Sequence, residues 1–379
     1  MNVRRMLLRG GLLALALSLG AAAGGSAAGQ TNAATWSIVA SPSVGLSSEL
    51  FSVSADGSSD VWAVGNSFAS NSYRTLGERW DGTKWTIVST PNARTNNWLN
   101  GVAALSAANV WAVGFSNDST WAQNRTLAEH WDGTKWTVIA TPNPTSGEND
   151  LWGVAAVSEN DVWAVGDVST STGGLKTLIE HWNGTAWSVV STPNLTPYNA
   201  LRAVSASSTG DVWAVGNAYD AQTDTWKTLT EHWDGTRWKI VSSPSQGADD
   251  YLRAVSARAS NDVWFVGEAD DPAPNYTPHP LVEHWNGSTW SIVSSRQGAY
   301  TLYGTVALTA TDAWIVGDAN QGAQTLGEHW TGTSWSVVAT PNVAGSSENA
   351  LDAVAATGTT LWAVGASGGK TLVLRATGA

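Results

Sequence analysis

The sequence contains no cysteine among its 379 residues. Thiolate metal sites and thiol catalysis are therefore excluded, and a packed core must hold the fold without disulfides. Basic residues are also scarce, because 19 lysines and arginines stand against 31 acidic residues and give a formal net charge of −12. Such a charge disfavours nucleic acid and anionic lipid as partners. We expect no cofactor.

Long apolar runs are missing after the first residues of the chain. The run from Leu12 to Ala23 follows Arg4 and Arg5 and ends near the small residues Ser26-Ala27-Ala28. This is the pattern of an export signal, and the arginine pair resembles a twin-arginine signal. We therefore expect a signal over residues 1–28 and one domain over 29–379. It would be secreted or at the cell surface, monomeric, and without a transmembrane segment after signal removal.

Tryptophan is abundant, with 24 residues, and it is periodic. The stretch Asp60-Val61-Trp62-Ala63-Val64-Gly65 recurs in near-identical form about every 50 residues. The later copies centre on Trp111, Trp163, Trp213, Trp264, Trp314 and Trp362. The sequence therefore predicts an array of seven similar units.

Each unit is predicted to contain four short strands. In the third unit they cover residues 151–156, 161–166, 177–182 and 187–190, and they are rich in aromatic and β-branched residues. The last two strands join through Asn183-Gly184, a dipeptide typical of tight hairpins. Both faces of the second strand are apolar, so each unit needs a neighbour on either side.

The two ends of the chain predict how the array closes. Residues 36–39 match only the fourth strand of a unit, whereas residues 371–378 match only a third strand. The termini are therefore expected to build one blade together, which leaves no exposed edge. The predicted fold is an all-β, seven-bladed β-propeller of four-stranded antiparallel blades, with its ring closed by the N-terminal strand.

Three motif resemblances accompany this pattern. The period and the closure resemble kelch propellers such as the central domain of galactose oxidase. The Gly-x-x-Trp hairpin, as from Gly82 to Trp85, resembles the BNR or Asp-box turn. The whole pattern is similar to bacterial secreted propellers built on VWAVG and EHWDG repeats. Trp80-Asp81 matches the WD dipeptide in letters, but it opens a hairpin, so we treat that match as false.

Comparison of the seven units separates scaffold from candidate site. A Glu-His-Trp run such as Glu180-His181-Trp182 recurs in five units, and Glu78-Arg79-Trp80 stands in the first. These residue types could serve acid and base catalysis, but a catalytic site normally occurs once on a propeller. We therefore predict that the run forms a buried, hydrogen-bonded structural network.

The residue after the first-strand leucine differs from unit to unit. We expect these side chains to form a ring around the mouth of the central channel, where they either bind a ligand or merely plug the opening. They are Phe51, Asn100, Trp152, Arg202, Arg253, Tyr303 and Asp352. Asp167, Glu268 and Asp318 follow the glycines of the second strands and are expected to face Arg202 and Arg253.

Aromatic loop residues add to this candidate surface. Trp98, Trp121 and Trp226 lie outside the repeat pattern and on the same predicted face, where they either contact a ligand or pack onto the blades. An acidic group lies on two loops of the fifth blade, and it is either solvated loop charge or a weak candidate for a hard cation. Its members are Asp249, Asp250, Glu268, Asp270 and Asp271.

The favoured function is non-catalytic binding of a glycan, a cell-wall polymer or a protein. An enzymatic alternative, glycoside hydrolysis or polysaccharide lyase activity on an acidic sugar, resembles sialidase and lyase propellers. It would use Arg202 and Arg253 to hold a carboxylate, Tyr303 as nucleophile or base, and Asp352 as acid. A structural assembly scaffold is the third alternative.

Overall fold

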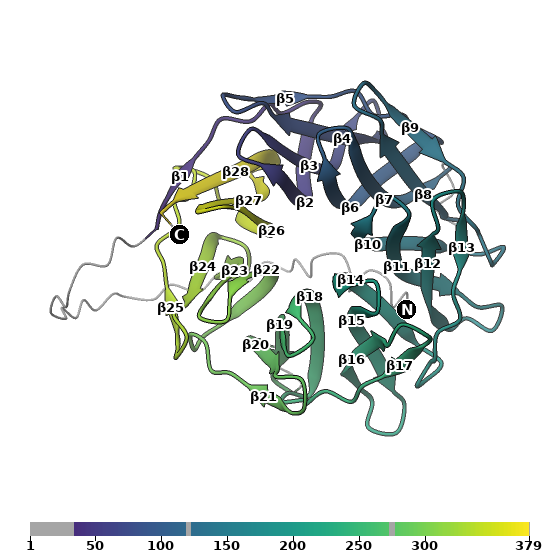
Figure 1. The fold of residues 1–379 in the computed structure, drawn as a ribbon. Coiled ribbons are helices and arrows are strands. Elements are labelled where there is room, and N and C mark those ends of the chain that lie inside the picture. The colour runs from purple at the N-terminus through teal and green to yellow at the C-terminus, as the bar shows by residue number, and fades with distance from the viewer. Residues whose placement is uncertain (1–33, 119–122, 273–276, 379) are drawn as a thin grey trace, which may run out of the picture. The chain divides into compact units, whose positions relative to one another are not determined.

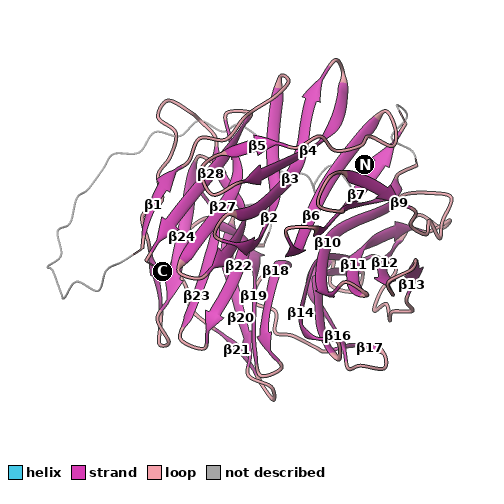
Figure 2. Cartoon of the chain, turned by 45° about the horizontal axis from the view of Figure 1, so that its top comes forward, coloured by secondary structure: helices cyan, strands magenta, loops and turns pink. Residues whose placement is uncertain are grey.

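The computed structural model describes residues 34–118, 123–272 and 277–378. These residues form seven four-stranded antiparallel sheets arranged as blades around a ring (Figure 1). Figure 2 shows strands and loops throughout the described residues. No helix in this part of the chain is long and apolar enough to cross a bilayer. The predicted signal at residues 1–28 lies outside the described residues.

The first four blades follow the chain in order. Blade 1 contains β2 (Ser47–Gly57), β3 (Asp60–Ala69), β4 (Ser72–Trp80) and β5 (Trp85–Ile87). Blade 2 contains β6 (Asn96–Ser106), β7 (Asn109–Asn117), β8 (Arg125–Trp131) and β9 (Trp136–Ile139). Blade 3 contains β10 (Asn149–Ser158), β11 (Asp161–Ser169), β12 (Leu175–Trp182) and β13 (Trp187–Val189). Blade 4 contains β14 (Asn199–Ser208), β15 (Asp211–Asp220), β16 (Thr225–Trp233) and β17 (Trp238–Ile240).

The last three blades complete the ring. Blade 5 contains β18 (Asp249–Ala259), β19 (Asp262–Asp270), β20 (Pro278–Trp285) and β21 (Trp290–Ile292). Blade 6 contains β22 (Tyr300–Thr309), β23 (Asp312–Ala319), β24 (Gln324–Trp330) and β25 (Trp335–Val337). Blade 7 contains β26 (Asn349–Thr357), β27 (Thr360–Ser367), β28 (Lys370–Thr377) and, from the other end of the chain, β1 (Thr35–Ile38).

The predicted closure of the ring is confirmed. Strand β1 pairs antiparallel with β28, with Trp36 opposite Ala376 and Ile38 opposite Leu374. The first strand of each blade lies innermost, around the centre of the ring (Figure 1). The seven-bladed all-β fold predicted from the repeats is therefore the observed one.

The core consists of seven apolar clusters, one at each contact between neighbouring blades. On β11, Val162 and Ala164 pack toward blade 2, whereas Trp163 and Val165 pack toward blade 4. At most of these contacts, the second-strand tryptophan of one blade packs against two tryptophans of the next blade. Trp62, for example, lies 5.0 Å from Trp131 and 5.2 Å from Trp136 between ring centroids. This double-sided packing explains why both faces of the second strand are apolar.

The inner strand of every blade contains a β-bulge beside the glycine that ends the VWAVG-type motif. In blade 3, Leu151 pairs with Gly166 and Gly153 pairs with Val165, so Trp152 is the extra residue. A Cβ atom added at Gly166 would overlap the carbonyl oxygen of Asp150. The same overlap occurs at the corresponding glycine of all seven blades. Glycine is therefore required here by close backbone approach.

The Glu-His-Trp run is structural, as predicted, but its glutamate differs from the expectation. His181 bonds to Asp161 at 2.8 Å and lies 4.2 Å from the Trp163 ring, and the Trp182 indole donates to the Glu159 carbonyl. The Glu180 side chain is fully buried, and neither of its oxygens has a hydrogen-bond partner within the described residues. The predicted hydrogen-bonded network is therefore wrong for this carboxyl group.

Burial keeps these glutamates protonated instead. Burial raises the pKa of Glu78 and of Glu180 to about 8, and raises the pKa of Glu231 to about 7 although Thr192 donates to it. Protonation avoids the cost of a buried, unpaired charge. In blade 7 the register places Leu374 at this position, also fully buried. The scaffold therefore needs a neutral side chain there.

Replacement of Gly166 by alanine should lower the free energy of unfolding by about 3 kcal/mol or more, because the new Cβ collides with backbone. Gly57→Ala is the matched control, since no atom lies within 4 Å of a Cβ at that position. Urea unfolding of both variants measures the difference. Similar losses in the two variants would contradict the close-approach explanation.

The stability of the protein should fall as the pH rises from about 5 to about 8. In the unfolded chain the glutamates ionise near their ordinary pKa of 4.5, whereas folded Glu78 and Glu180 keep their protons up to about pH 8. Each such glutamate lowers the free energy of unfolding by up to about 1.4 kcal/mol for every pH unit in this window. Below the unfolded pKa the glutamate is protonated in both states, so the loss is absent there.

The variant Glu180→Gln isolates one share of this dependence. As the pH rises, the free energy of unfolding of this variant should fall less steeply than that of the wild type, because a carboxamide cannot ionise. Urea unfolding at several pH values measures the difference. A difference that stays constant from pH 5 to pH 8 would rule out a protonated Glu180.

Candidate binding site at the channel mouth

The seven side chains predicted to ring the channel mouth occupy one equivalent backbone position. Each is the extra residue of the inner-strand bulge. The preceding leucine is fully buried in all seven blades, whereas the bulge residue is half-buried in all seven. The bulge therefore anchors the strand through the leucine and turns the next side chain toward solvent.

Several bulge residues contact the inner strand of the next blade. Asn100 Nδ2 donates to the Leu151 carbonyl of the next blade at 2.8 Å. The Arg202 guanidinium lies 4.6 Å from the centroid of the Trp152 ring, and that of Arg253 lies 5.4 Å from the centroid of Tyr303. The structure thus brings these predicted residues together in pairs across blade boundaries. Their role in binding stays a prediction.

Trp152, Asp167 and Arg202 form the first cluster at the mouth. Trp152 Nε1 donates to Asp167 Oδ1 at 2.9 Å, and Arg202 lies 3.5 Å from the same oxygen. The Arg202 side chain is 14% exposed and that of Asp167 is 4% exposed. The carboxylate therefore orients both the indole and the guanidinium, and part of the arginine still faces solvent.

Arg253, Glu268 and Tyr303 form the second cluster. Arg253 Nε donates to Glu268 Oε1 at 3.1 Å, and Thr301 Oγ1 donates to Glu268 Oε2 at 2.7 Å. Burial raises the pKa of the Tyr303 phenol, although Arg253 acts in the opposite direction. The phenol is therefore neutral at physiological pH.

The expectation that acids after the second-strand glycines face the two arginines is confirmed for Asp167 and Glu268. Asp167 reaches the arginine of the next blade, whereas Glu268 binds the arginine of its own blade. Asp318 accepts a hydrogen bond from the Gly322 backbone in the β23–β24 turn.

The tryptophans outside the repeat pattern have different environments. Trp98 is 8% exposed and is sandwiched between Tyr73 and Phe115, with ring centroids at 4.8 and 4.7 Å. Trp98 therefore packs under this face and offers little of its own surface to a ligand. Trp226 is half-buried beside Tyr219. Trp121 lies outside the described residues.

Sequence reasoning missed that these rings form a continuous line across three blades. Phe68 and Tyr73 start it, Trp98 and Phe115 continue it, and Trp152 lies 5.8 Å from Phe115 at its end. Phe115 follows the second-strand glycine, where blade 7 carries alanine and the other five blades carry polar residues. That departure from the repeat could have identified it.

The acidic group of blade 5 does not assemble a cation site. Asp249 accepts from the Trp226 backbone and Asp250 accepts from the Gly247 backbone, while Asp271 pairs with His279. Burial, and then Glu268, raises the pKa of Asp270 to about 7. Within the described ranges, no group of three or more metal-ligating side chains is present.

Comparisons with known proteins establish likeness of fold. No protein-family model matches the chain, and no curated protein matches it in sequence. A solved structure described as YCF48 bound to D1 peptide is 14% identical, with a TM-score of 0.56 over 91% of this chain and 95% of that one. YCF48 from Cyanidioschyzon merolae is 16% identical, with a TM-score of 0.57 over 90% and 98%.

The WD40 β-propeller domain of Doa1 is 12% identical to this chain, with a TM-score of 0.57 over 89% of this chain and 96% of that domain. Identities this low show a shared propeller fold and assign no function. The predicted resemblance to kelch and Asp-box repeats, and a bacterial origin, stay predictions.

Replacement of Asp167 by asparagine should lower the free energy of unfolding by about 1–3 kcal/mol, because the largely buried Arg202 loses its counter-charge. Asparagine fits the position, since Asn66 and Asn217 occupy it in blades 1 and 4. The double variant Asp167→Asn, Arg202→Met removes both charges and should recover most of the loss in urea unfolding. Equal losses in the single and double variants would contradict the coupling.

Proposed function

We propose that this chain is a non-catalytic binding propeller that recognises a partner protein with the face around its channel mouth. The observation that carries the proposal is a constant bulge that presents seven largely different side chains. The leucine and the glycine that build the bulge are the same in every blade. Side chains that vary on a fixed backbone are the expected location of recognition.

The clusters around Arg202 and Arg253 offer polar and aromatic groups that suit the surface of a partner protein. Arg202 and Arg253 are held by carboxylates and lie against aromatic rings, so little side-chain entropy is lost when a ligand contacts them. The two guanidinium groups can contact peptide carbonyls, and Trp152 can cover an apolar side chain. The charges are balanced within each cluster, which favours polar and aromatic contacts over a strongly charged ligand.

A protein partner is favoured over a glycan or a cell-wall polymer. One neighbour in fold is a propeller described as bound to a peptide, which is precedent for the fold and identifies no partner for this chain. The sequence pattern of residues 1–28 supports the further proposal that the protein acts after export, secreted or at the cell surface.

The enzymatic alternative has less support from the geometry. Arg202 and Arg253 already have their own carboxylate partners, so neither is free to clamp a substrate carboxylate. Burial raises the pKa of Tyr303, which makes its phenol a poor nucleophile at neutral pH.

Peptides selected from a displayed library against the wild-type protein test the proposal. Trp152→Ala and Arg202→Ala should each weaken binding of the selected peptides by about 2 kcal/mol or more, as at other interface hot spots. Arg237→Ala, on the exposed β16–β17 hairpin, is the control and should leave affinity unchanged. Peptide affinity that is insensitive to both channel-mouth variants would refute the proposal, as would selection of acidic glycans but no peptide by the wild type.

A further inference from the structure

A cavity of about 360 Å³ lies in blade 6, away from the bulge residues of the channel mouth. The β23–β24 turn and the first residues of β24 line one part of it, and the end of β25 with the following residues lines another. The link between blades 5 and 6 completes it with Arg296 and Tyr300. It is therefore built from the outer strands of one blade and the segment that enters that blade.

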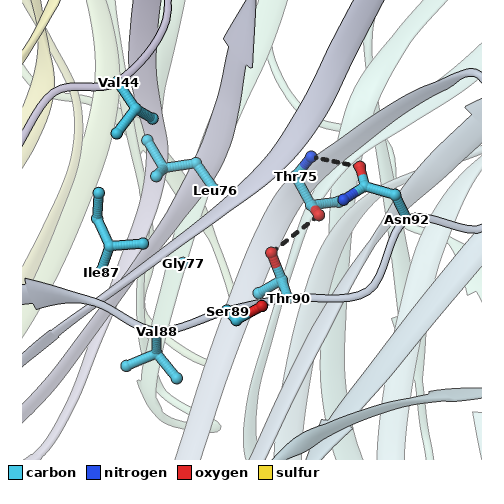
Figure 3. Close-up of a pocket in the computed structure, with 9 residues that line it drawn as sticks. All are labelled: Val44, Thr75, Leu76, Gly77, Ile87, Val88, Ser89, Thr90 and Asn92. Atoms are coloured by element: carbon cyan, nitrogen blue, oxygen red, sulfur yellow. Dashed lines mark hydrogen bonds between the residues drawn. The ribbon is translucent and has the colours of Figure 1, made fainter.

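Blade 1 holds an equivalent cavity of about 330 Å³ (Figure 3). Thr75, Gly77 and Asn92 there correspond to Thr325, Gly327 and Asn342 in blade 6. Figure 3 shows Thr75 hydrogen-bonded to Thr90 and Asn92, with the apolar side chains grouped apart.

The two cavities differ in the segment that enters the blade and in the turn between the second and third strands, which lines only the blade 6 cavity. The entering segment contributes the apolar Val44 in blade 1, but Arg296 and Tyr300 in blade 6. The outer-strand residues that line both cavities belong to the repeated scaffold. Arg296 and Tyr300 are specific to the cavity of blade 6.

Arg296 departs from the repeat. Each of the other six units carries proline at this position, as at Pro244 and Pro341. The Arg296 guanidinium lies 4.7 Å from the centroid of the Tyr300 ring, and the residue is exposed. Its backbone N–H donates to Glu328 Oε2 at 3.5 Å. In the part of the chain that the structure describes, no carboxylate lies within ion-pair distance of its guanidinium, whereas Arg202 and Arg253 are both paired.

The polar lining of the cavity suits an anion. Among the described residues no acidic side chain lines it, although the chain has 31 acidic residues. Gln324 Oε1 accepts from Asn320, and Asn342 Oδ1 accepts from the Thr325 backbone. For neither Gln324 Nε2 nor Asn342 Nδ2 is there an acceptor in the described ranges. One guanidinium and two amide groups are thus available as donors, which matches the needs of a carboxylate.

Apolar side chains line one part of the cavity, beside the hydroxyl groups of Thr325 and Thr340. Leu326, Val337, Val338 and Ala339 contribute to the wall, and Tyr300 adds its ring. A cavity of about 360 Å³ is at the small end of ligand pockets, so it can hold a single residue or a small acid. A small apolar group on the carboxylate can pack against this part of the wall.

We propose that this cavity is a second ligand site, one that binds a carboxylate carried on a small apolar group, the chemistry of a peptide's C-terminal residue. Arg296 binds the carboxylate through its planar fork, and Gln324 and Asn342 donate further hydrogen bonds. The apolar wall receives the aliphatic part. The site does not depend on the proposed function of the channel mouth, because none of the seven bulge residues takes part.

N-acetyl-leucine is the probe, titrated into the full protein while amide signals are followed by NMR. Signals of Gln324, Gly327 and Asn342 should shift with a millimolar dissociation constant, while those of Gly77 and Asn92 in the blade 1 cavity stay unchanged. The primary amide of the probe should bind about tenfold or more weakly, because a charged hydrogen-bonded contact is lost.

Variants separate the site from general effects of charge. Arg296→Gln keeps the backbone N–H that donates to Glu328, and Arg296→Pro restores the residue of the other units, so both variants should fold. Both should weaken binding by about tenfold or more. Arg237→Ala removes an exposed arginine elsewhere and should leave binding unchanged. Equal binding of acid and amide, retained binding in both Arg296 variants, or equal binding of glucuronate and N-acetyl-leucine would overturn the proposal. So would the absence of shifts at saturating probe.

Discussion

The packing of tryptophans across each blade boundary is the interaction on which the ring depends. A blade with apolar side chains on both faces is stable only between two neighbours, and the second-strand tryptophan fills that contact against the outer strands of the next blade. At the closure the N-terminal strand supplies the partner, since Trp36 lies 6.0 Å from Trp314. The two ends of the chain are thereby held by the same interaction as the blades between them.

A repeated scaffold can still present a surface that differs from blade to blade. The leucine, the bulge and the glycine fix the backbone at the channel mouth, and the bulge residue lies outside the apolar core. The side chains at that position differ, and the clusters around Arg202 and Arg253 arise from them. At the blade 6 cavity, likewise, Arg296 stands where the other units carry proline, beside outer strands that line an equivalent cavity in blade 1.

Charge is handled in two ways in this acidic chain. Where a carboxylate can meet an arginine, as Asp167 and Glu268 do, the pair remains charged and orients nearby aromatic rings. Where no partner is available among the described residues, as for Glu180 between blades, burial raises the pKa and the group stays neutral. The presence of Leu374 at the same position of blade 7 agrees with a neutral glutamate in the others.

The sequence by itself determined the blade number, the four strands per blade, the split closing blade and the list of variable positions. The reason is that a regular repeat aligns equivalent positions of every unit without reference to the structure. It did not determine that Phe51, Trp152 and their equivalents are bulge residues, since the bulge arises from pairing with a glycine on the next strand. Nor did it show that Trp98 is sandwiched between rings, or that Arg296 borders a cavity. Those contacts join residues from different strands and blades, so only tertiary packing decides them.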